Sequence, residues 1–484
     1  MHRRAVLLLA LWSASMAPAA ASPVADRIWP PGGALAVHVD EVLRLNFDAP
    51  PELGAAGSVR IYRKQGDLLV DTVLVAGDVE QLGYAGMAQV RLLNNPAIAI
   101  DGNTASIRLH SDKLRYGTEY YVVVDDGVLA GATLGGAPFH GIAKPMAWSF
   151  TTKAEAPRSA DVTVDDDGPA DFRTVQGALN YVMQNVARDS AATITVKDGH
   201  YREMLYLRGK DKLTIRGESR DGVVIEFDNN DGINPGTGAS TVPGAGTVKG
   251  GRALFLVEDA DLLTLDTLTL HNTHLKTGKG DQAESLYFNS PFRLIARNVT
   301  FLSRQDTLLV NGYSWFYNCL VAGDVDFIWG YANVALFENS EIRSIVDNTN
   351  ASKGGYVLQA RSRSPTDLGY VFFNSRLTSE PGVPSGKTYL ARSSGRNTVY
   401  DQVAFINTEI GAHIAADGWH IKPPPAPAIA TATTGWREYN SKARAGTHVA
   451  GYSYQLTSEE YRATYISRAR IFAAYNQLGW NPQP

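Results

Sequence analysis

The chain has 484 residues, a length that favours two domains or one long repeat array over a single compact domain. Hydrophobic residues make up 44% of the sequence, which is enough for a packed core and excludes a disordered chain. The net charge of −4 gives no reason to expect nucleic acid or an anionic membrane as the main partner. No apolar run is long enough to cross a membrane, so we expect no membrane anchor.

The first 21 residues have the pattern of a secretion signal. Two arginines precede a short apolar run at residues 5–12, and small residues at 17–21 (APAAA) are typical of a cleavage site. We therefore expect residues 1–21 to be a signal peptide and the mature protein to be secreted, to the periplasm or the medium. The alternative is a buried helix of the mature protein. The sole cysteine, Cys319, cannot form an internal disulfide, so core packing must supply the stability.

Residues 22–153 contain short segments in which apolar and polar residues alternate. Turn residues separate these segments and no helical pattern interrupts them, which predicts an antiparallel β-sandwich. The expected strands are residues 42–47, 58–62, 68–75, 88–93, 105–110, 119–124 and 146–151.

The same region resembles the immunoglobulin-like domains of secreted bacterial enzymes. The resemblance lies in residues 30–33 (PPGG), 114–120 (LRYGTEY) and 148–152 (WSFTT). The region contains no paired acids, metal-spaced histidines or glycine loop. Two roles stay open: a spacer or packing partner, and a carbohydrate-binding module.

The pattern changes after a short linker at residues 154–159 (AEAPRS), and residues 154–484 are expected to form a second domain. A short β-prone run, often with asparagine at its second position, recurs there. The second positions are Thr267, Asn298, Asn318, Asn339, Asn374 and Gln402. The shortest interval is 20 residues, lengthened elsewhere by loops, which indicates a solenoid. Short strands without regular helices between them predict an all-β protein with a parallel β-helix, in which stacked asparagines could form a hydrogen-bonded ladder.

The start of this domain predicts a cap for the solenoid. Residues 171–182 have helical periodicity, with Val175, Leu179 and Val182 on the apolar face. A helix there would cover the open sheet edge of the first coil. Further on, residues 228–250 form a glycine- and proline-rich segment typical of a functional or mobile loop.

Two aspartates, Asp306 and Asp326, stand 20 residues apart in apolar, strand-like sequence. A buried carboxylate without a partner is costly, so this placement needs an explanation. In a β-helix, equivalent positions of successive coils stack about 4.8 Å apart. Gln282, Gln305 and Asp326 are separated by 23 and 21 residues, so we expect them on one face of three neighbouring coils. Arg392 would lie two or three coils later on the same groove.

Two acids, two amides and one guanidinium suit ester hydrolysis without a serine nucleophile. One ionised aspartate can attack an ester carbonyl while the glutamine side chains donate hydrogen bonds to the oxyanion. The second carboxyl, when protonated, can give a proton to the leaving alkoxide and then act as a base toward water. Neighbouring carboxylates differ in pKa, and the acid that pairs with Arg392 stays ionised as the nucleophile. Spacing alone does not decide which aspartate this is. No GxSxG or HExxH sequence occurs.

The second domain resembles the pectin methylesterase (pectinesterase) family over nearly its whole length. The matching segments are residues 171–176 (DFRTVQ), 198–203 (DGHYRE), 282–286 (QAESL), 305–308 (QDTL), 324–330 (DVDFIWG) and 455–460 (QLTSEE). The resemblance implies a right-handed parallel β-helix. It also implies that Asp326 is the nucleophile, Asp306 the general acid and then base, and Gln282 and Gln305 the oxyanion donors, with Arg392 holding Asp326.

The sequence departs from the family pattern beside this arginine. The family has LGRPW where this chain has LARSS, so Ser394 replaces a tryptophan on which a sugar would stack. Trp329, where the family commonly has phenylalanine, is a candidate replacement, and Trp419 is a second; the alternative for Trp329 is a core position. Asp324 shares a face with Asp326, but we expect a hydrogen-bonded polar residue there rather than a third catalytic acid.

The resemblance implies a secreted esterase that removes methyl groups from the galacturonate esters of pectin, in pectin catabolism or cell-wall modification. We expect no metal or organic cofactor. Methyl-esterified homogalacturonan is the expected partner, with no nucleic acid and no membrane anchor, and we expect a monomer. Two alternatives remain: a divergent member acting on another ester or a thioester, and a non-catalytic pectin-binding protein.

Overall fold

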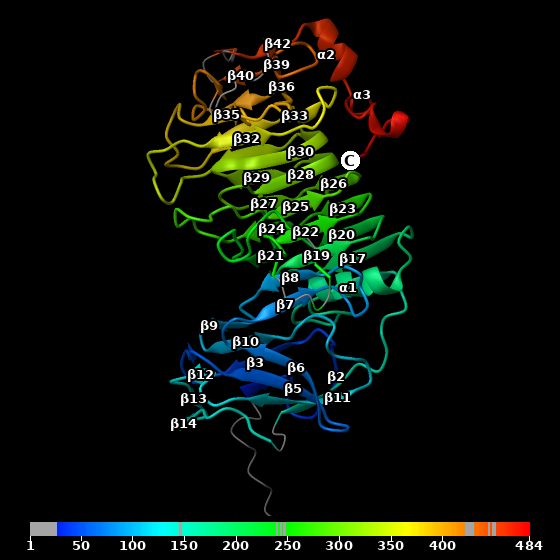
Figure 1. The fold of residues 1–484 in the computed structure, drawn as a ribbon, viewed down its shortest axis with the longest axis vertical. Coiled ribbons are helices and arrows are strands. Elements are labelled where there is room, and N and C mark those ends of the chain that lie inside the picture. Colours follow the sequence, from blue (N-terminus) through cyan, green and yellow to red (C-terminus); the bar gives the residue numbers. More distant parts are fainter. Residues whose placement is uncertain are drawn as a thin grey trace, which may run out of the picture.

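A computed structural model describes residues 27–144, 148–238, 241–242, 244, 248–421, 430–443, 446–447 and 452–484. The expected signal peptide and the first residues of the strand expected at 146–151 lie outside these ranges. Two units are stacked along the long axis: a body of mostly antiparallel sheets at the N-terminal end, and a long coil of parallel strands that forms the rest (Figure 1). No helix among the described residues has the length and apolar character needed to cross a membrane.

The N-terminal unit contains two main sheets, consistent with the predicted sandwich. One sheet has the order β1 (Ile28–Trp29), β3 (Val42–Asn46), β10 (Thr104–Arg108), β9 (Ile98–Asp101); the other has the order β2 (Ala34–Val37), β15 (Ser149–Thr152), β11 (Glu119–Val124), β5 (Ser58–Arg63), β6 (Leu68–Leu74). Smaller pairs join β4 (Glu52–Leu53) to β12 (Leu129–Ala130), β13 (Thr133–Leu134) to β14 (Ala137–Pro138), and β7 (Val79–Leu82) to β8 (Arg91–Asn94). Alternating side chains such as Leu43 and Leu45 are fully buried between the sheets, as the sequence pattern predicts. The likeness to immunoglobulin domains and the boundary at residue 153 stay predictions.

The second unit is a parallel β-helix with three faces, in agreement with the prediction. The first face stacks β16 (Asp161–Val164), β17 (Ala192–Val196), β20 (Leu213–Gly217), β23 (Leu263–Asp266), β26 (Arg293–Arg297), β28 (Leu308–Tyr317), β30 (Val325–Glu338), β33 (Gly369–Phe373), β36 (Val403–Ile406), β39 (Trp436–Tyr439) and β42 (Tyr454–Gln455). The second face stacks β19 (Leu205–Arg208), β22 (Phe255–Glu258), β25 (Leu286–Asn289), the beginnings of β28 and β30, β32 (Tyr356–Ala360), β35 (Tyr389–Arg392) and β38 (Trp419–His420). The third face stacks β18 (Gly199–Arg202), β21 (Val223–Phe227), β24 (Thr269–Asn272), β27 (Thr300–Leu302), β29 (Leu320–Gly323), β31 (Glu341–Ser344), β34 (Arg376–Ser379), β37 (Glu409–Ile410) and β40 (Lys442–Ala443), with β41 (Gly446–Thr447) turning back antiparallel.

The repeated asparagines occupy the turns that lead from the first face to the third. Asn298, Asn318, Asn339 and Asn374 have φ angles of 49 to 54°. Asparagine tolerates this left-handed conformation better than most residues, which explains its recurrence. The amide of Asn318 donates to that of Asn298 at 2.7 Å, so the expected ladder is confirmed there.

The sequence placed the last member of this ladder wrongly. Gln402 immediately precedes β36 and its side chain contacts Arg437. Asn407 instead occupies the turn, with φ of 50°, and donates to Asn374 at 3.2 Å. The run at residues 401–405 contains most of β36 itself, so the alignment matched Gln402, at the start of a strand, with asparagines that follow the strands of the first face.

The interior of the coil is filled by side chains that stack from one turn to the next. Phe316, Phe337, Phe372 and Phe405 form one such column, with ring centroids 4.5 to 5.0 Å apart. Stacked rings on parallel strands bury large apolar areas and fix the register of the coils.

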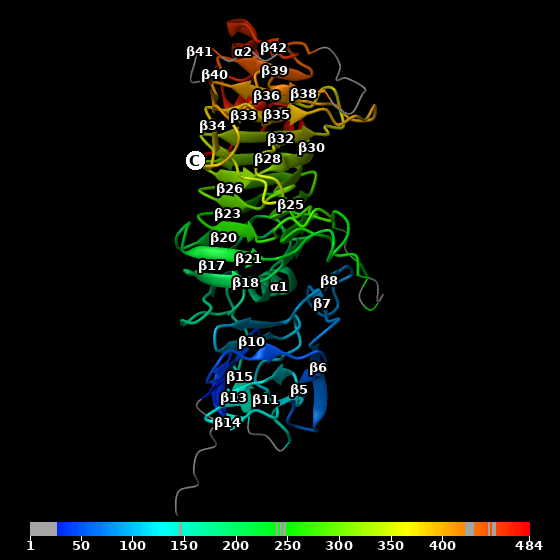
Figure 2. The same cartoon turned by 90° about the vertical axis from the view of Figure 1, so that its left-hand side faces the viewer.

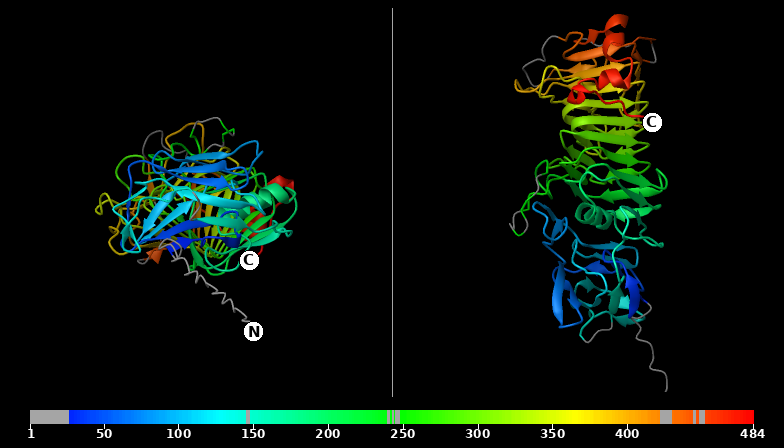
Figure 3. Two further views of the ribbon diagram at one scale, coloured as in Figure 1. Left: turned by 90° about the horizontal axis from the view of Figure 1, so that it is seen from below. Right: turned by 90° about the vertical axis from the view of Figure 1, so that its right-hand side faces the viewer.

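Helices close and flank the β-helix. Helix α1 (Val175–Asn185) begins at the N-cap Thr174 and buries Val175, Leu179 and Val182 against the first coil, as predicted. Figure 3 shows α1 at the junction of the two units. Helices α2 (Ser458–Thr464) and α3 (Arg468–Ile471) and the 3-10 helix Tyr475–Gln477 follow the last strand, and they cover apolar side chains on the outside of the coil (Figure 1).

Candidate active site

Asp306 and Asp326 lie at equivalent places on neighbouring coils, just before β28 and at the start of β30. Both have left-handed backbone conformations, with φ of 67° and 46°. Non-glycine residues adopt this conformation at a cost, and such residues occur often at functional sites. The stacked column here is Gln282, Gln305 and Val325, so Asp306 rather than Gln305 matches Asp326 in register. The expected column of Gln282, Gln305 and Asp326 is therefore wrong by one residue.

Arg392 holds Asp326 from a coil two turns further along. It lies at the end of β35, which pairs with β32, and β32 pairs with β30. Its Nε donates to Asp326 Oδ1 at 2.8 Å, and its Nη2 donates to Asp326 Oδ2. Asp326 is only 4% exposed. A bidentate arginine fixes both carboxylate oxygens and favours the ionised form.

Asp306 is held by a second arginine, Arg252, which precedes β22. Arg252 Nη2 donates to Asp306 Oδ2 at 2.8 Å. The same guanidinium donates through Nε to both oxygens of Glu284, at 3.1 and 3.0 Å, and through Nη1 to Asp231 at 3.0 Å. Asp306, Glu284 and Arg252 are all buried, so one cation serves three carboxyl groups, two of which are largely shielded from solvent.

The surroundings shift the pKa values of the two aspartates to different extents. Burial raises the pKa of Asp306 well above its ordinary value, the charge of Glu284 raises it further, and Arg252 opposes both effects. Burial also raises the pKa of Asp326, but the hydrogen bonds and charge of Arg392 oppose the shift. The charge of Arg361 lowers the pKa of both aspartates. Asp306 is therefore the carboxyl that is driven further toward its protonated form.

Gln282 and Gln305 lie side by side on neighbouring coils, and both are partly exposed. Among the described residues, neither side-chain amide takes part in a hydrogen bond, whereas their backbone carbonyls accept from Asp231 and Ala283. Two amides with free N–H groups are thus available beside the aspartates, as an oxyanion site requires.

The two tryptophans predicted to bind sugar are buried, and this part of the prediction is wrong. Trp419 is 2% exposed and stacks on Trp436 at 4.7 Å inside the β-helix. Trp329 is 5% exposed and lies beneath the guanidinium groups of Arg361 and Arg252, at 4.7 and 5.8 Å from the ring centroid. Trp329 therefore supports two arginines of the site by cation–π contact rather than offering a face to a ligand.

Asp324 belongs to a separate buried ion-pair cluster. Lys276 Nζ lies 2.9 Å from Asp324 Oδ2 and 2.8 Å from Asp347 Oδ2. This is the hydrogen-bonded role expected from the sequence, and it leaves Asp324 outside the pair of catalytic candidates.

Three charged residues of the site were missed by sequence reasoning: Arg252, Glu284 and Arg361. Glu284 stands two residues after Gln282 in apolar sequence, and a buried glutamate requires a cation, so it gave a usable signal. Arg252 follows a glycine-rich loop and Arg361 follows a strand, and nothing in the local sequence connects either one to the aspartates.

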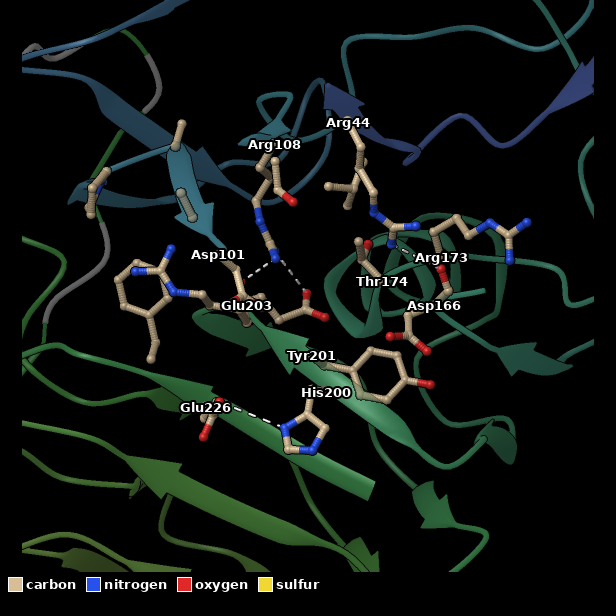
Figure 4. A pocket seen from close by; sticks show the side chains of 17 residues that line it. Arg44, Asp101, Arg108, Asp166, Arg173, Thr174, His200, Tyr201, Glu203 and Glu226 are labelled. Carbon is tan, nitrogen blue, oxygen red and sulfur yellow. Dashed lines mark hydrogen bonds and ion pairs between the residues drawn. The ribbon is translucent and has the colours of Figure 1, made fainter. Parts of the chain in front are cut away.

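The crevice between the two units is a separate feature. It encloses about 490 Å³ and is lined by side chains such as Arg44, Arg108 and Glu203, while none of the five catalytic candidates lines it. Its charged groups bind one another: Arg108 pairs with Glu203 at 3.5 Å, and Arg44 donates to the carbonyl of Asp166 at 3.3 Å (Figure 4). These contacts join the two units.

A parallel β-helix that brings two buried carboxyl groups, each with its own arginine, beside two free amides has the equipment of an ester hydrolase that uses carboxyl chemistry. Comparison with known proteins agrees with this class. The pectinesterase family model matches residues 161–469, well over half of the chain. The chain therefore belongs to the pectinesterase family of carboxylic ester hydrolases.

Relatives and solved structures agree with this assignment. Pectinesterase 31 of Arabidopsis thaliana is 31% identical over 262 residues, which cover 54% of this chain and 76% of that protein. Pectinesterase 2 of Olea europaea is 26% identical over 313 residues, covering 63% and 77%. The structure of pectin methylesterase PemA from Erwinia chrysanthemi, 24% identical, superposes with a TM-score of 0.54 over 66% of this chain and 98% of that one. At this identity the likeness to PemA shows the β-helical fold.

Proposed function

We propose that the protein hydrolyses the methyl esters of galacturonate in pectin, giving pectate and methanol. The observation that carries the proposal is the contrast between the two acids. Arg392 donates hydrogen bonds to Asp326, whereas burial and the charge of Glu284 raise the pKa of Asp306 on the neighbouring coil. Membership of the pectinesterase family supports the substrate. A structural relative that was solved as a pectin methylesterase with a bound hexasaccharide adds support for a polymeric sugar ligand.

In the proposed reaction, Asp326 is the nucleophile. One of its carboxylate oxygens attacks the ester carbonyl carbon, and the carbonyl oxygen becomes an oxyanion that accepts hydrogen bonds from Gln282 and Gln305. When the tetrahedral centre collapses, the bond to the methoxy oxygen breaks and Asp306 gives its proton to that oxygen, releasing methanol. An acid anhydride then links Asp326 to the galacturonate carbonyl.

Water completes the cycle. The ionised Asp306 takes a proton from a water molecule as the water oxygen attacks the galacturonate carbonyl carbon of the anhydride. The bond to Asp326 breaks, Asp326 leaves as a carboxylate, and the galacturonic acid that forms loses its remaining proton to solvent and departs as galacturonate. Asp306 is again protonated, so the enzyme is restored without a cofactor. Arg392 favours the ionised Asp326 at the start and at the end of the cycle.

Two half-buried tyrosines are the strongest candidates for the sugar-stacking surface that Ser394 does not provide. Tyr356 and Tyr389 are stacked with ring centroids 5.8 Å apart, and the guanidinium of Arg392 lies 5.0 Å above the ring of Tyr356. The aromatic surface is therefore next to the arginine that holds the nucleophile. Aromatic faces suit the apolar side of a sugar ring.

The remaining parts of the proposal concern domain organisation and location. We propose that residues 22–153 form an immunoglobulin-like domain, that residues 154–484 form the esterase domain, and that a signal at residues 1–21 directs the chain out of the cytoplasm. Secretion would bring a monomeric enzyme to a polysaccharide that lies outside the cell.

The test is methanol release from highly methyl-esterified pectin by the purified mature chain. We expect methanol in step with new carboxylate groups, and loss of both in Asp326→Asn, with unchanged circular dichroism as the control for folding. Full activity of Asp326→Asn would overturn the nucleophile assignment. Acetylated glycans and thioesters form further arms, and hydrolysis of these without methanol from pectin would redirect the substrate. Binding of pectin without turnover would favour a non-catalytic role.

A further inference from the structure

The hairpin formed by β7 and β8 belongs to the N-terminal part of the chain but packs in the β-helix. Its apolar side chains Leu82, Met87, Val90, Leu92 and Leu93 lie in the core that runs through the β-helix, and not in the separate core of the two N-terminal sheets. Figures 1 and 2 both show the hairpin next to α1 and the first coils. The hairpin therefore extends from the N-terminal unit and packs as part of the β-helical unit.

Arg91, at the start of β8, is fully buried and donates only to backbone carbonyls of the β-helix. Its five hydrogen bonds go to Gly250 (2.8 Å), Leu205 (2.7 Å), Leu254 (3.2 Å), Gly251 (3.1 Å) and Ala253. Burial lowers the pKa of Arg91 to about 9, so it stays charged at neutral pH. A buried guanidinium with such complete hydrogen bonding imposes a fixed position on the segment that it binds.

The segment that Arg91 binds has no room to shift. A Cβ on Gly250 would lie 2.2 Å from the carbonyl oxygen of Leu92 in β8. Gly251 has φ of 73°, and a Cβ there would lie 2.1 Å from the backbone of Gly238. The chain thus passes between the hairpin and the preceding loop at distances that only glycine permits.

Arg252 lies inside this segment, between the two carbonyls of Gly251 and Ala253 that Arg91 Nη2 holds. It is the arginine that contacts Asp306 at 2.8 Å. The hairpin also binds the loop that carries another partner of Arg252, Asp231: Asn94 donates to the carbonyl of Ile233 at 2.8 Å and accepts from the amide of Asn234. Both sides of the Arg252 site are therefore attached to the N-terminal hairpin.

We propose that Arg91 is a positioning residue for the esterase reaction, which it serves by fixing Arg252 and, through Arg252, the carboxyl of Asp306. The N-terminal unit is then a structural part of the active site rather than a spacer or an independent carbohydrate-binding module. This inference rests on the proposed role of Asp306 as the proton donor.

The charged groups that face Asp306 define what a loss of this support would do. They are Arg252 and Glu284 from the segments before β22 and β25, Asp326 from β30, and Arg361 from the segment after β32. Arg252 is the cation at hydrogen-bonding distance, so its displacement favours protonated Asp306. The proton donor would then stay protonated to higher pH, and its orientation toward the leaving group would be less well defined.

The experiment compares Arg91→Lys and Arg91→Met in the full mature chain. With methyl-esterified pectin we expect kcat to fall roughly 10- to 100-fold, because small displacements of a catalytic group are costly. KM should change little, and the basic limb of the pH–rate profile should move to higher pH. Arg91→Lys retains the charge and some hydrogen bonds, so its loss of kcat should be smaller. If Arg91→Met does not fold, Arg91→Lys still allows the measurement.

Arg108→Met is the matched control. Arg108 also joins the two units, donating to the carbonyl of Arg202 and pairing with Glu203, but its hydrogen bond and ion pair do not involve residues 250–254. We expect a lower Tm with unchanged kcat and pH profile. Wild-type kcat and pH profile in both Arg91 variants would overturn the proposal. Equal losses of kcat in Arg108→Met would do so too, because they would show a general effect of domain contact.

A crystal structure of Arg91→Lys separates this inference from the proposed function. If the wild-type enzyme releases no methanol, the proposed function fails, yet the contact between Arg252 Nη2 and Asp306 Oδ2 can still be measured. Loss of that contact in Arg91→Lys supports the positioning role, and its retention at 2.8 Å contradicts it.

Discussion

The two aspartates are held by arginines of different origin. Arg392 comes from a regular strand of the β-helix, pairs with Asp326 alone, and is half-buried. Arg252 comes from an irregular segment, is shared among Asp306, Glu284 and Asp231, and sits in a segment bound by the hairpin of another unit. A repeated coil thus supplies the arginine that orients the proposed nucleophile and opposes the rise of its pKa. The proposed proton donor has competing charges and support from outside the repeat, which suits a group whose pKa must allow both gain and loss of a proton.

Among the tests of this comparison, exchange of each aspartate for asparagine should have the largest effect on activity. Asp326→Asn removes the proposed nucleophile and should reduce kcat by about 10⁴-fold or more. Asp306→Asn removes the proposed proton donor but leaves the proposed nucleophile and oxyanion donors, so we expect a smaller loss, roughly 10²- to 10⁴-fold. Steady-state methanol release measures both. Equal activity of the two variants would show that the division of roles is wrong.

Replacement of the glutamines should cause the next largest loss of activity. Removal of one proposed oxyanion donor, in Gln282→Ala or Gln305→Ala, should lower kcat by roughly 10²- to 10³-fold with little change in KM, because the oxyanion forms only during the reaction. Circular dichroism serves as the control for folding. A change confined to KM would place these amides in substrate binding instead.

Glu284→Gln tests whether Glu284, which shares Arg252 with Asp306, sets the pKa of Asp306. The negative charge of Glu284 raises the pKa of Asp306, so its removal should lower that pKa and leave Arg252 to favour ionised Asp306. The basic limb of the pH–rate profile should then move to lower pH, opposite to the shift expected for Arg91 variants. At the optimum kcat should fall by less than about tenfold, because no group that touches the substrate is lost. An unmoved limb would mean that Glu284 is neutral or that another group controls the limb.

Tyr356→Leu should give the smallest effect. Loss of an aromatic face costs about 1 kcal/mol, or about fivefold in KM, with kcat nearly unchanged. Kinetics on long and short pectin fragments provide the measurement, and Tyr389→Leu is the comparison variant. If KM is unchanged in both, the sugar-stacking surface lies elsewhere.

The sequence predicted the parts of the site that follow from the repeat. Asp306 and Asp326 lie on neighbouring coils and Arg392 lies two coils later, because each coil contributes one strand to each face. Gln305 was placed in the wrong column by one residue. The coils that carry Gln305 and Asp326 are offset by 20 residues on either side of this position, with Thr300 opposite Leu320 and Leu308 opposite Ile328, so the 21-residue step to Asp326 is one residue too long. Val325 occupies the place in the column that was assigned to Asp326.

Burial and long-range contacts could not be predicted in this way. Trp419 looked like a groove residue beside glycine and histidine, but its stack on Trp436 depends on the spacing of two later coils. Arg252 reaches Asp306 across 54 residues, and Arg91 reaches Ala253 across 162. No local pattern encodes contacts of this range, because they form only when loops and units fold against one another.

The intrusion of the hairpin also changes what counts as the esterase module. A cut at residues 154–159 follows the linker but removes Leu92 and Leu93 from the β-helix core and leaves the carbonyls of Gly250 and Gly251 without their donor. Newly exposed apolar surface of this kind promotes aggregation. In structural terms, residues 79–94 belong to the β-helical unit although they precede it in the chain. Exchange of the N-terminal unit between relatives would therefore have to retain this hairpin.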